Sequence, residues 1–161
     1  MYEGSSFILE NKINFKEAKE SDVEKIVEML ADDFLGSERE DYKVPLPASY
    51  INAFKAIESD PNNELIVAWL ESEIVGVQQI TFTPYITRQG GWRATIEGVR
   101  VSASFQGKGL GTELIRWAIN RAKERGCHLV QLTTDKRRAD SLSFYEKLGF
   151  KASHEGLKMT L

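Results

Sequence analysis

Three glycines lie close together between a predicted strand and a predicted helix, in the run Gln106-Gly107-Lys108-Gly109-Leu110-Gly111-Thr112. Glycine lets the backbone approach a ligand without a Cβ in the way. The first turn of a helix adds N–H groups that have no partner within the helix, and the positive end of the helix dipole favours an anion there. The spacing therefore predicts a phosphate or pyrophosphate site at this turn.

Three phosphate-binding signatures compete for the turn. A Walker loop needs Ser or Thr after its lysine to hold magnesium, but Lys108 is followed by Gly109. A dinucleotide fingerprint needs Gly-x-Gly-x-x-Gly and a later acidic residue at a strand end, and the chain has neither. The third signature, Gln/Arg-x-x-Gly-x-Gly/Ala, matches Gln106-x-x-Gly109-x-Gly111.

That signature follows a Val99-Arg100-Val101 strand and precedes Phe144-Tyr-Glu-Lys-Leu-Gly-Phe150. Together these motifs resemble the GCN5-related N-acetyltransferases over about residues 13–161. The resemblance implies acetyl-CoA as the co-substrate, with strand backbone holding its pantetheine arm and turn N–H groups holding its pyrophosphate. In such proteins the strand splays away from the next one, commonly at a bulge, and the pantetheine occupies the gap. The cofactor-binding residues implied are Val99, Arg100, Val101, Gln106, Gly107, Lys108, Gly109, Leu110, Gly111 and Thr112.

Tyr145 resembles the family's tyrosine that protonates the departing thiolate, so we expect it to act as the general acid. The alternative is that Tyr145 only packs in the core, since aromatic residues on helices usually do.

Glu97 is the candidate general base, acting directly or through water, because an unperturbed alkylamine with a pKa of about 10.4 must lose a proton before it attacks. Strand alternation predicts that Glu97, Val99 and Val101 share one face. The alternative is a solvated carboxylate, or one paired with Arg93 or Arg100.

Arg138 lies where many family members have an asparagine that contacts the cofactor, seven residues before the tyrosine. We expect Arg138 to contact coenzyme A in its place, and Lys108 and Arg137 are further candidates for a phosphate contact. A solvated basic cluster is the other interpretation.

Cys127 is the only cysteine, so the chain has no internal disulfide, and direct transfer is favoured over an acetylated thiol. His128 and His154 do not form a His-x-x-x-His pair, and we expect neither catalysis nor a metal site from them.

Composition narrows the class of protein. The chain has 161 residues, 42% of them hydrophobic, which predicts a single domain over residues 1–161 with residues 1–11 as a loose tail. A net charge of −3 disfavours nucleic acid and anionic membrane surfaces as partners. The lone cysteine and the absence of an apolar signal segment favour the cytoplasm.

Hydrophobic periodicity predicts an α/β (α+β) fold: a mixed, mostly antiparallel, splayed sheet flanked by about four helices. A capping box at Ser21–Glu24 opens the first helix. The expected strands are 13–16, 65–70, 74–83, 92–102, 129–133, 150–153 and 157–161; the expected helices begin at 23, 48, 110 and 140 or 141.

The protein is therefore expected to transfer acetyl from acetyl-CoA to a primary amine, with a small-molecule acceptor favoured over a protein. Glu38, Glu40 and Asp41 are candidates to attract a cationic amine. The alternatives are a protein lysine or N-terminal acetyltransferase, and a regulatory module that binds coenzyme A without catalysis. Open sheet edges make a homodimer plausible.

Overall fold

A computed structural model of the protein describes residues 12–161, so the expected tail at 1–11 lies outside the described residues. Five strands form one sheet in chain order: β1 (Ile13–Glu17), β2 (Asn63–Leu70), β3 (Glu73–Pro84), β4 (Trp92–Val101) and β5 (Cys127–Leu132). The helices are η1 (Glu20–Asp22), α2 (Val23–Ala31), α3 (Gly36–Arg39), α4 (Ala48–Ser59), α5 (Thr87–Gly90), η2 (Ala103–Phe105), α6 (Leu110–Glu124) and α7 (Ser141–Lys147).

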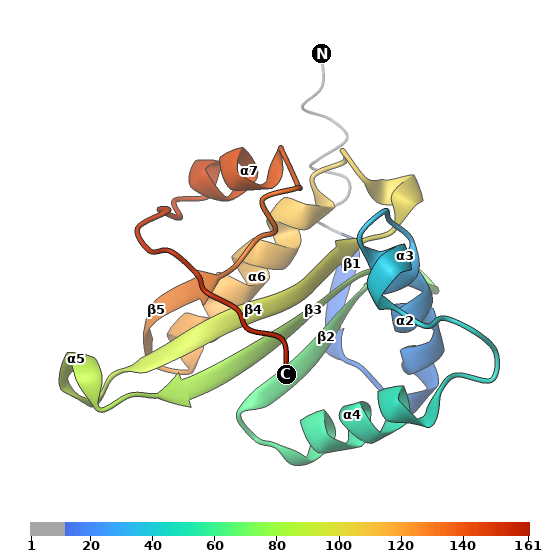
Figure 1. The fold of residues 1–161 in the computed structure, drawn as a ribbon, viewed down its shortest axis with the longest axis horizontal. Helices are drawn as coiled ribbons and strands as arrows, with labels where there is room; N and C mark the ends of the chain where they lie inside the picture. Colours follow the sequence, from blue (N-terminus) through green and yellow to red (C-terminus); the bar gives the residue numbers. More distant parts are fainter. Residues whose placement is uncertain (1–11) are drawn as a thin grey trace.

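The pairing of the strands makes the sheet mixed. Neighbours from β1 to β4 are antiparallel, whereas β4 and β5 run parallel because α6 connects them. Helix α6 covers one face, and α2 and α4 cover the other (Figure 1). The predicted fold class is confirmed.

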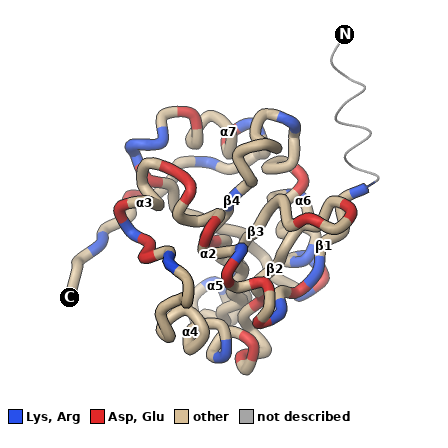
Figure 2. The backbone as a smooth tube through the Cα atoms, turned by 90° about the vertical axis from the view of Figure 1, so that its right-hand side faces the viewer, with Lys and Arg blue, Asp and Glu red and all other residues tan. Residues whose placement is uncertain are grey.

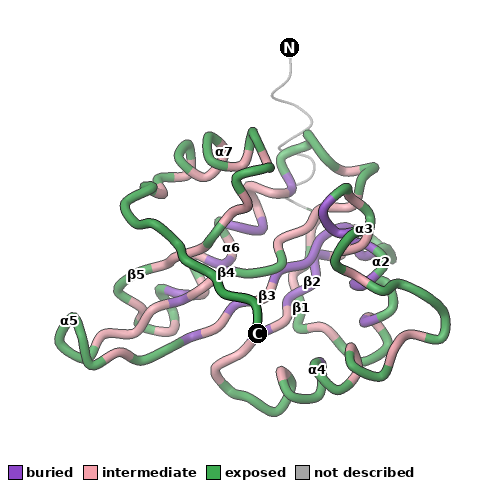
Figure 3. Tube along the Cα trace, in the orientation of Figure 1, coloured by how far each residue is buried: buried purple, intermediate pink, exposed green. Residues whose placement is uncertain are grey.

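Helix α6 is amphipathic in the predicted way. The stripe Leu110, Leu114, Ala118 and Ala122 is buried. Figure 3 shows buried and exposed stretches along this helix. It packs against β3 and β4 residues such as Ile80 and Ile96. Gly126, with a φ of 71°, follows the helix, which is the left-handed conformation that commonly ends one.

The second helical layer covers the other face through α2 and α4. Val23, Val27 and Phe54 form one buried cluster there. The predicted capping box is wrong in its residues: the Asp22 carboxylate accepts the Lys19 N–H at 2.8 Å, and the side chains of Ser21 and Glu24 take no part. The reason is that the short helix η1 precedes α2 and places the N-cap at Lys19, two residues before the predicted Ser21.

Strand β4 splays from β5 beyond its midpoint. The last parallel pair is Ile96 with Leu132, although β4 continues to Val101. Next to this point β4 has a bulge, since Gln79 opposes Glu97 whereas Val77 opposes Arg100. Gly98 supplies the extra residue, and its φ of 60° suits glycine.

The two predicted closing strands at 150–153 and 157–161 are wrong for this chain, because neither segment is paired with a strand. The apolar alternation of the sequence is present, but a strand requires a neighbouring edge to satisfy its N–H and C=O groups. Within residues 12–161 no helix has the length and apolarity needed to cross a bilayer.

Candidate functional site

A cavity of about 340 Å³ opens at the glycine turn between β4 and α6. Its lining contains six of the residues that the sequence predicts for cofactor binding, namely Val101, Gln106, Gly107, Gly109, Gly111 and Thr112. The aromatic side chains of Phe105 and Phe144 complete the lining. The cavity therefore lies at the turn where a pyrophosphate is expected.

The backbone of this turn suits an anion. Gly109 caps α6 with a φ of 86°, and Gly107 has a φ of 73°, a region that side-chain-bearing residues rarely adopt. The first-turn N–H groups of Leu110, Gly111 and Thr112 have no acceptor within the helix, because intrahelical bonding begins with Glu113 donating to Gly109. A diphosphate fits this set of donors.

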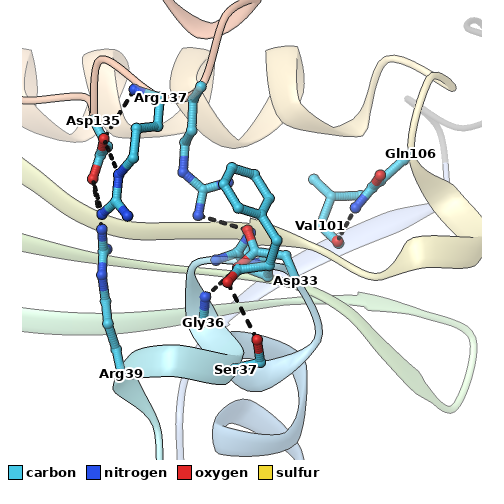
Figure 4. Close-up of polar contacts among 11 residues, drawn as sticks. Asp33, Gly36, Ser37, Arg39, Val101, Gln106, Asp135 and Arg137 are labelled. Atoms are coloured by element: carbon cyan, nitrogen blue, oxygen red, sulfur yellow. Dashed lines mark hydrogen bonds and ion pairs between the residues drawn. The ribbon is translucent and has the colours of Figure 1, made fainter.

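The open edge of β4 leads into the same cavity. The Ser102 N–H donates to the Val75 carbonyl at 2.9 Å, so the backbone groups of Val101 point away from β3. The Val101 carbonyl accepts only a long bond of 3.4 Å from Nε2 of Gln106 (Figure 4). With no β5 partner beyond Ile96, this edge suits an extended ligand that carries amides.

Tyr145 lies half-buried on α7. Its ring makes edge contacts with Phe144 and Phe150, at centroid distances of 5.0 and 5.8 Å. Burial raises the pKa of the Tyr145 hydroxyl; nearby Arg138 lowers it and Glu97 raises it. Within residues 12–161 no hydrogen bond engages this hydroxyl. The expected general acid is thus a protonated phenol with a free donor.

Glu97 does not share a face with Val99 and Val101, so that prediction is wrong. Glu97 and Arg100 oppose Gln79 and Val77, which project to one face, whereas Val101 opposes Gly76 on the other. The bulge at Gly98 shifts the alternation by one residue, and no inspection of periodicity alone reveals it. Glu97 is exposed, and among the described residues it forms no ion pair with Arg93 or Arg100.

Arg100 and Arg138 meet at one carboxylate. Asp33, just after α2, pairs with Arg100 and with Arg138, the latter at 2.6 Å. The exposed fraction of the side chain is 13% for Arg100, 27% for Arg138 and 14% for Asp33. Burial raises the pKa of Asp33, but the Gly36 N–H and the two guanidinium groups together lower it below the ordinary value. We call these three residues the Asp33 cluster.

A second set of contacts lies beside the Asp33 cluster. Asp135 accepts from Arg39 at 2.7 Å and from Arg137 at 3.0 and 3.1 Å (Figure 4). Arg137 also lies 3.5 Å from Glu38. Helix α3 is thereby bound to the loop before α7. Arg137 and Arg138 thus have carboxylate partners here, whereas Lys108 is exposed and lies over the Phe105 ring at 5.1 Å.

The acidic residues expected to attract an amine are also engaged within the chain. Glu40 accepts the Tyr50 hydroxyl at 2.9 Å, Asp41 pairs with Lys43 at 2.7 Å, and Glu38 faces Arg137. Acidic and basic residues are interspersed along the chain in Figure 2.

Other candidate residues lie elsewhere. Cys127 pairs in register with Trp92, at the opposite end of β4 from Val101, and burial raises the pKa of its thiol. His154 lies on the exposed C-terminal segment, where its Nδ1 contacts Ser153 Oγ at 2.8 Å. Five predicted cofactor residues do not line the cavity: Val99, Arg100, Lys108, Leu110 and Arg138. Leu110 is buried, and its main-chain N–H is what faces the turn.

Sequence reasoning missed Asp33, Phe105 and Phe144 as site residues. Phe105 precedes the glycine run and Phe144 precedes Tyr145. An aromatic residue next to each motif could therefore have been predicted to line the cavity. Asp33 had no such signal, because its partners Arg100 and Arg138 are 67 and 105 positions away.

A splayed mixed sheet, an open strand edge and a helix terminus with unpaired N–H groups, together with a half-buried tyrosine, are the arrangement of an acyltransferase of the N-acetyltransferase class. The sequence profile of the acetyltransferase (GNAT) family matches residues 23–150. The chain therefore belongs to the acetyltransferase (GNAT) family.

Three relatives illustrate the likeness. Aminoalkylphosphonate N-acetyltransferase of Salmonella typhimurium is 28% identical over 106 residues, which are 66% of this chain and 68% of that protein. Glucosamine 6-phosphate N-acetyltransferase of Trypanosoma brucei brucei is 38% identical over 88 residues, 55% of this chain and 58% of that protein. The chain thus aligns with little more than half of the trypanosome enzyme.

The third relative is a solved structure. The crystal structure of a transcriptional regulator from Bacillus halodurans C-125 is 64% identical, has a TM-score of 0.90, and is matched over 92% of this chain and 99% of that chain.

Proposed function

We propose that the protein transfers an acetyl group from acetyl-CoA directly to the primary amine of a small molecule while both are bound. The observation that supports this most strongly is the cavity where the unpaired edge of β4 runs into the first turn of α6. Such a continuous set of backbone donors and acceptors matches a ligand with amides at one end and a diphosphate at the other.

The chain's own groups have distinct tasks in this proposal. The N–H groups from Gln106 through Thr112 hold the diphosphate, and the backbone of Val99 and Val101 holds the pantetheine amides. When bound, acetyl-CoA supplies an acetyl group activated as a thioester. Holding this group beside the amine lowers the barrier by about 7–11 kcal/mol, which exceeds the share of any single proton donor or acceptor.

Two protons must move as the new C–N bond forms and the C–S bond breaks. Tyr145 donates its hydroxyl proton to the departing sulfur, and its raised pKa keeps that proton in place at neutral pH. Glu97 accepts the proton of the amine through water. Glu97 is exposed and close enough to Tyr145 to affect its pKa, which supports a shared site for both groups.

A small acceptor is favoured over a protein. The segment after α2 is bound to the loop before α7 through the Asp33 cluster and Asp135, and Arg138 of this cluster lies close enough to Tyr145 to lower its pKa. Two named relatives act on small amines that carry phosphorus oxyanions. Arg100 and Arg138, which share only one carboxylate between them, suit such a group in the acceptor.

The test is a thiol-release assay with acetyl-CoA over a panel of amines: aminoalkylphosphonates, amino-sugar phosphates, amino acids and lysine peptides. We expect turnover with small amines and little with the peptides. Calorimetry with coenzyme A should show binding that Gly109→Val weakens and Gly156→Val does not. Failure to bind coenzyme A would overturn the proposal. Turnover with the lysine peptides alone would mean that the acceptor is a protein and not a small molecule.

A second candidate, a coenzyme A-binding regulator without catalysis, is raised by the name of the Bacillus halodurans relative. The discriminating result is coenzyme A binding together with no thiol release for any amine. The free hydroxyl of Tyr145 favours the enzyme.

A further inference from the structure

Arg100 and Arg138 lie on the two sides of the gap between β4 and β5. Pairing of these strands ends at Leu132; Arg100 lies beyond that point on β4, and Arg138 lies beyond it in the loop that follows β5. Asp33 contacts both guanidinium groups, so the Asp33 cluster spans the gap. Arg100 also projects from the face of β4 that carries Glu97. The cluster therefore lies on the face that holds the proposed base.

The Asp33 carboxylate leaves much of the hydrogen-bonding capacity of the two arginines unused. Both guanidinium groups contact the same oxygen, Oδ2, Arg100 through Nη1 and Arg138 through Nη2 at 2.6 Å. A guanidinium group carries more N–H donors than one oxygen can accept. Among the described residues no other carboxylate pairs with either arginine, and the buried Nε of Arg100 has no hydrogen-bond partner. A larger oxyanion would satisfy more of these donors.

The cluster also has an excess of positive charge. Two guanidinium groups face one carboxylate, and the nearby carboxylates of Asp135 and Glu38 contact Arg39 and Arg137 instead. A phosphate monoester carries a charge of about −1.5 to −2 at neutral pH and three strong acceptor oxygens. Guanidinium groups bind such oxygens in pairs. A tetrahedral dianion can therefore balance both arginines, which a single carboxylate cannot do.

Asp33 can release the arginines and still keep its place in the fold. Its other oxygen, Oδ1, accepts the Gly36 N–H at the start of α3, and this bond involves neither arginine. A carboxylate that loses its cations needs water in their place. The Asp33 side chain is partly exposed, so water reaches it. The pairing of Asp33 with the arginines is therefore separable from its contact with α3.

We propose that the oxyanion of the acceptor replaces the Asp33 carboxylate between Arg100 and Arg138. Asp33 is then an exchangeable counter-ion. An acceptor with a single carboxylate gains little from the exchange, whereas a phosphate or phosphonate dianion brings a second charge. Asp33 thereby determines which small amines are used, which presupposes the proposed transfer to such an amine. Glu97 and Arg138 both affect the pKa of Tyr145, which supports one site for the oxyanion and the two proton-transfer groups.

Methyl phosphate, an oxyanion without an amine, tests the exchange by calorimetry, with coenzyme A saturating the glycine turn. We expect it to bind about 10-fold more tightly to Asp33→Asn, because the competing charge is gone, and about 10-fold more weakly to Arg138→Gln. Asp32→Asn and Arg88→Gln, both at exposed positions, are the matched controls and should bind like the wild type. Equal or weaker binding by Asp33→Asn would overturn the proposal.

Enzyme kinetics extend the test to the substrate. The KM for 2-aminoethyl phosphate should fall about 10-fold in Asp33→Asn, whereas the KM for 2-aminoethanol, which lacks the phosphate, should not change. A purely structural role of Asp33 would disturb both substrates alike. Equal changes of the two KM values would therefore contradict the exchange.

A crystal structure of the wild type with coenzyme A and methyl phosphate tests the exchange without any variant. It should show phosphate oxygens on Arg100 and Arg138, with Oδ2 of Asp33 separated from both. Methyl phosphate bound elsewhere, or beside intact Asp33 pairs, would contradict the proposal. Neither result bears on coenzyme A binding or thiol release, so the proposed function is tested separately.

Discussion

Tyr145 and Glu97 lie in environments that suit the two different proton-transfer tasks proposed for them. Tyr145 is half-buried against Phe144 and Phe150, and burial is the main reason that its pKa is raised. Glu97 is exposed, on the face of β4 that also carries Arg100. A protonated donor and a solvated acceptor are what acetyl transfer to an amine needs at neutral pH.

Tyr145→Phe should lower kcat by about 10²–10⁴-fold, the usual share of one proton donor. Coenzyme A affinity, measured by calorimetry, should be nearly unchanged, because the ring and its packing remain. Tyr85→Phe is the matched control, since its ring lies by Arg93 at the far end of β3 and β4. Wild-type kcat in the first variant at every pH would remove the hydroxyl from the mechanism.

The pH profile follows from the same group. Because the pKa of Tyr145 is raised above 10.0, loss of the proton donor should reduce kcat only above that pH. Arg138→Gln removes a cation that lowers this pKa, so tyrosinate absorbance should appear at still higher pH. The absorbance of Tyr145 alone is obtained by subtracting the titration of the Tyr145→Phe variant. A shift of this absorbance to lower pH would contradict the effect of Arg138 on the Tyr145 pKa.

Glu97→Gln should flatten the rise of kcat with pH that comes from deprotonating the bound amine. Glu73→Gln, a solvent-exposed carboxylate on β3, is the control and should leave the profile intact. An unchanged profile in the Glu97 variant would leave amine deprotonation to water alone.

At the scale of elements, the site depends on where strands and helices begin and end. The Gly98 bulge and the end of β5 pairing at Leu132 free the β4 edge, and Gly109 sets the direction in which α6 starts. Both are backbone features, so the binding surface is mostly main chain.

Gly109→Ala should weaken coenzyme A binding and destabilise the protein by about 1–2 kcal/mol, because alanine at a φ of 86° is strained. Gly156→Ala is the control, since that glycine has open space around it and no positive φ. Equal effects of the two changes in urea unfolding would show that the turn is not held in this conformation.

Helix α6 is also fixed to β2 by a charged pair. Glu64, 7% exposed, accepts from Arg121 at 2.7, 3.0 and 3.1 Å. Glu64→Ala removes the buried partner of the partly buried Arg121 guanidinium and leaves it the exposed Glu124, so the change should cost about 3–5 kcal/mol of unfolding free energy. Glu124→Ala, at an exposed end of the same network, should cost less than about 1 kcal/mol by the same urea titration.

At the scale of the whole molecule, the Asp33 cluster connects the segment after α2 to β4 and to the loop before α7. Its strength depends on the ionised carboxylate, whose pKa lies below the ordinary 3.8 in the folded protein. A depressed pKa contributes stability above the unfolded-state pKa, and this contribution is lost as pH falls through the folded value.

The wild type should therefore lose more unfolding free energy between pH 7 and about pH 3 than Asp33→Asn does. At neutral pH the variant should be the less stable of the two. Asp32→Asn, the exposed neighbour, should behave like wild type. Parallel acid profiles for the wild type and the Asp33 variant in denaturant unfolding would contradict the cluster's role.

Sequence alone determined the features that depend on neighbours along the chain. The buried stripe of α6, the β2–β3 hairpin and the glycine turn follow from periodicity and backbone freedom, and these local causes act wherever the segment lies. The family signature also predicted most of the cavity lining.

Only the tertiary structure decided what depends on distant partners. The bulge places Glu97 opposite Gln79, Asp33 meets two arginines far along the chain, and residues 157–161 have strand periodicity without an edge to pair with. Ion pairs and strand ladders need groups brought together in space, and that proximity is a property of the packed chain, which no local pattern contains.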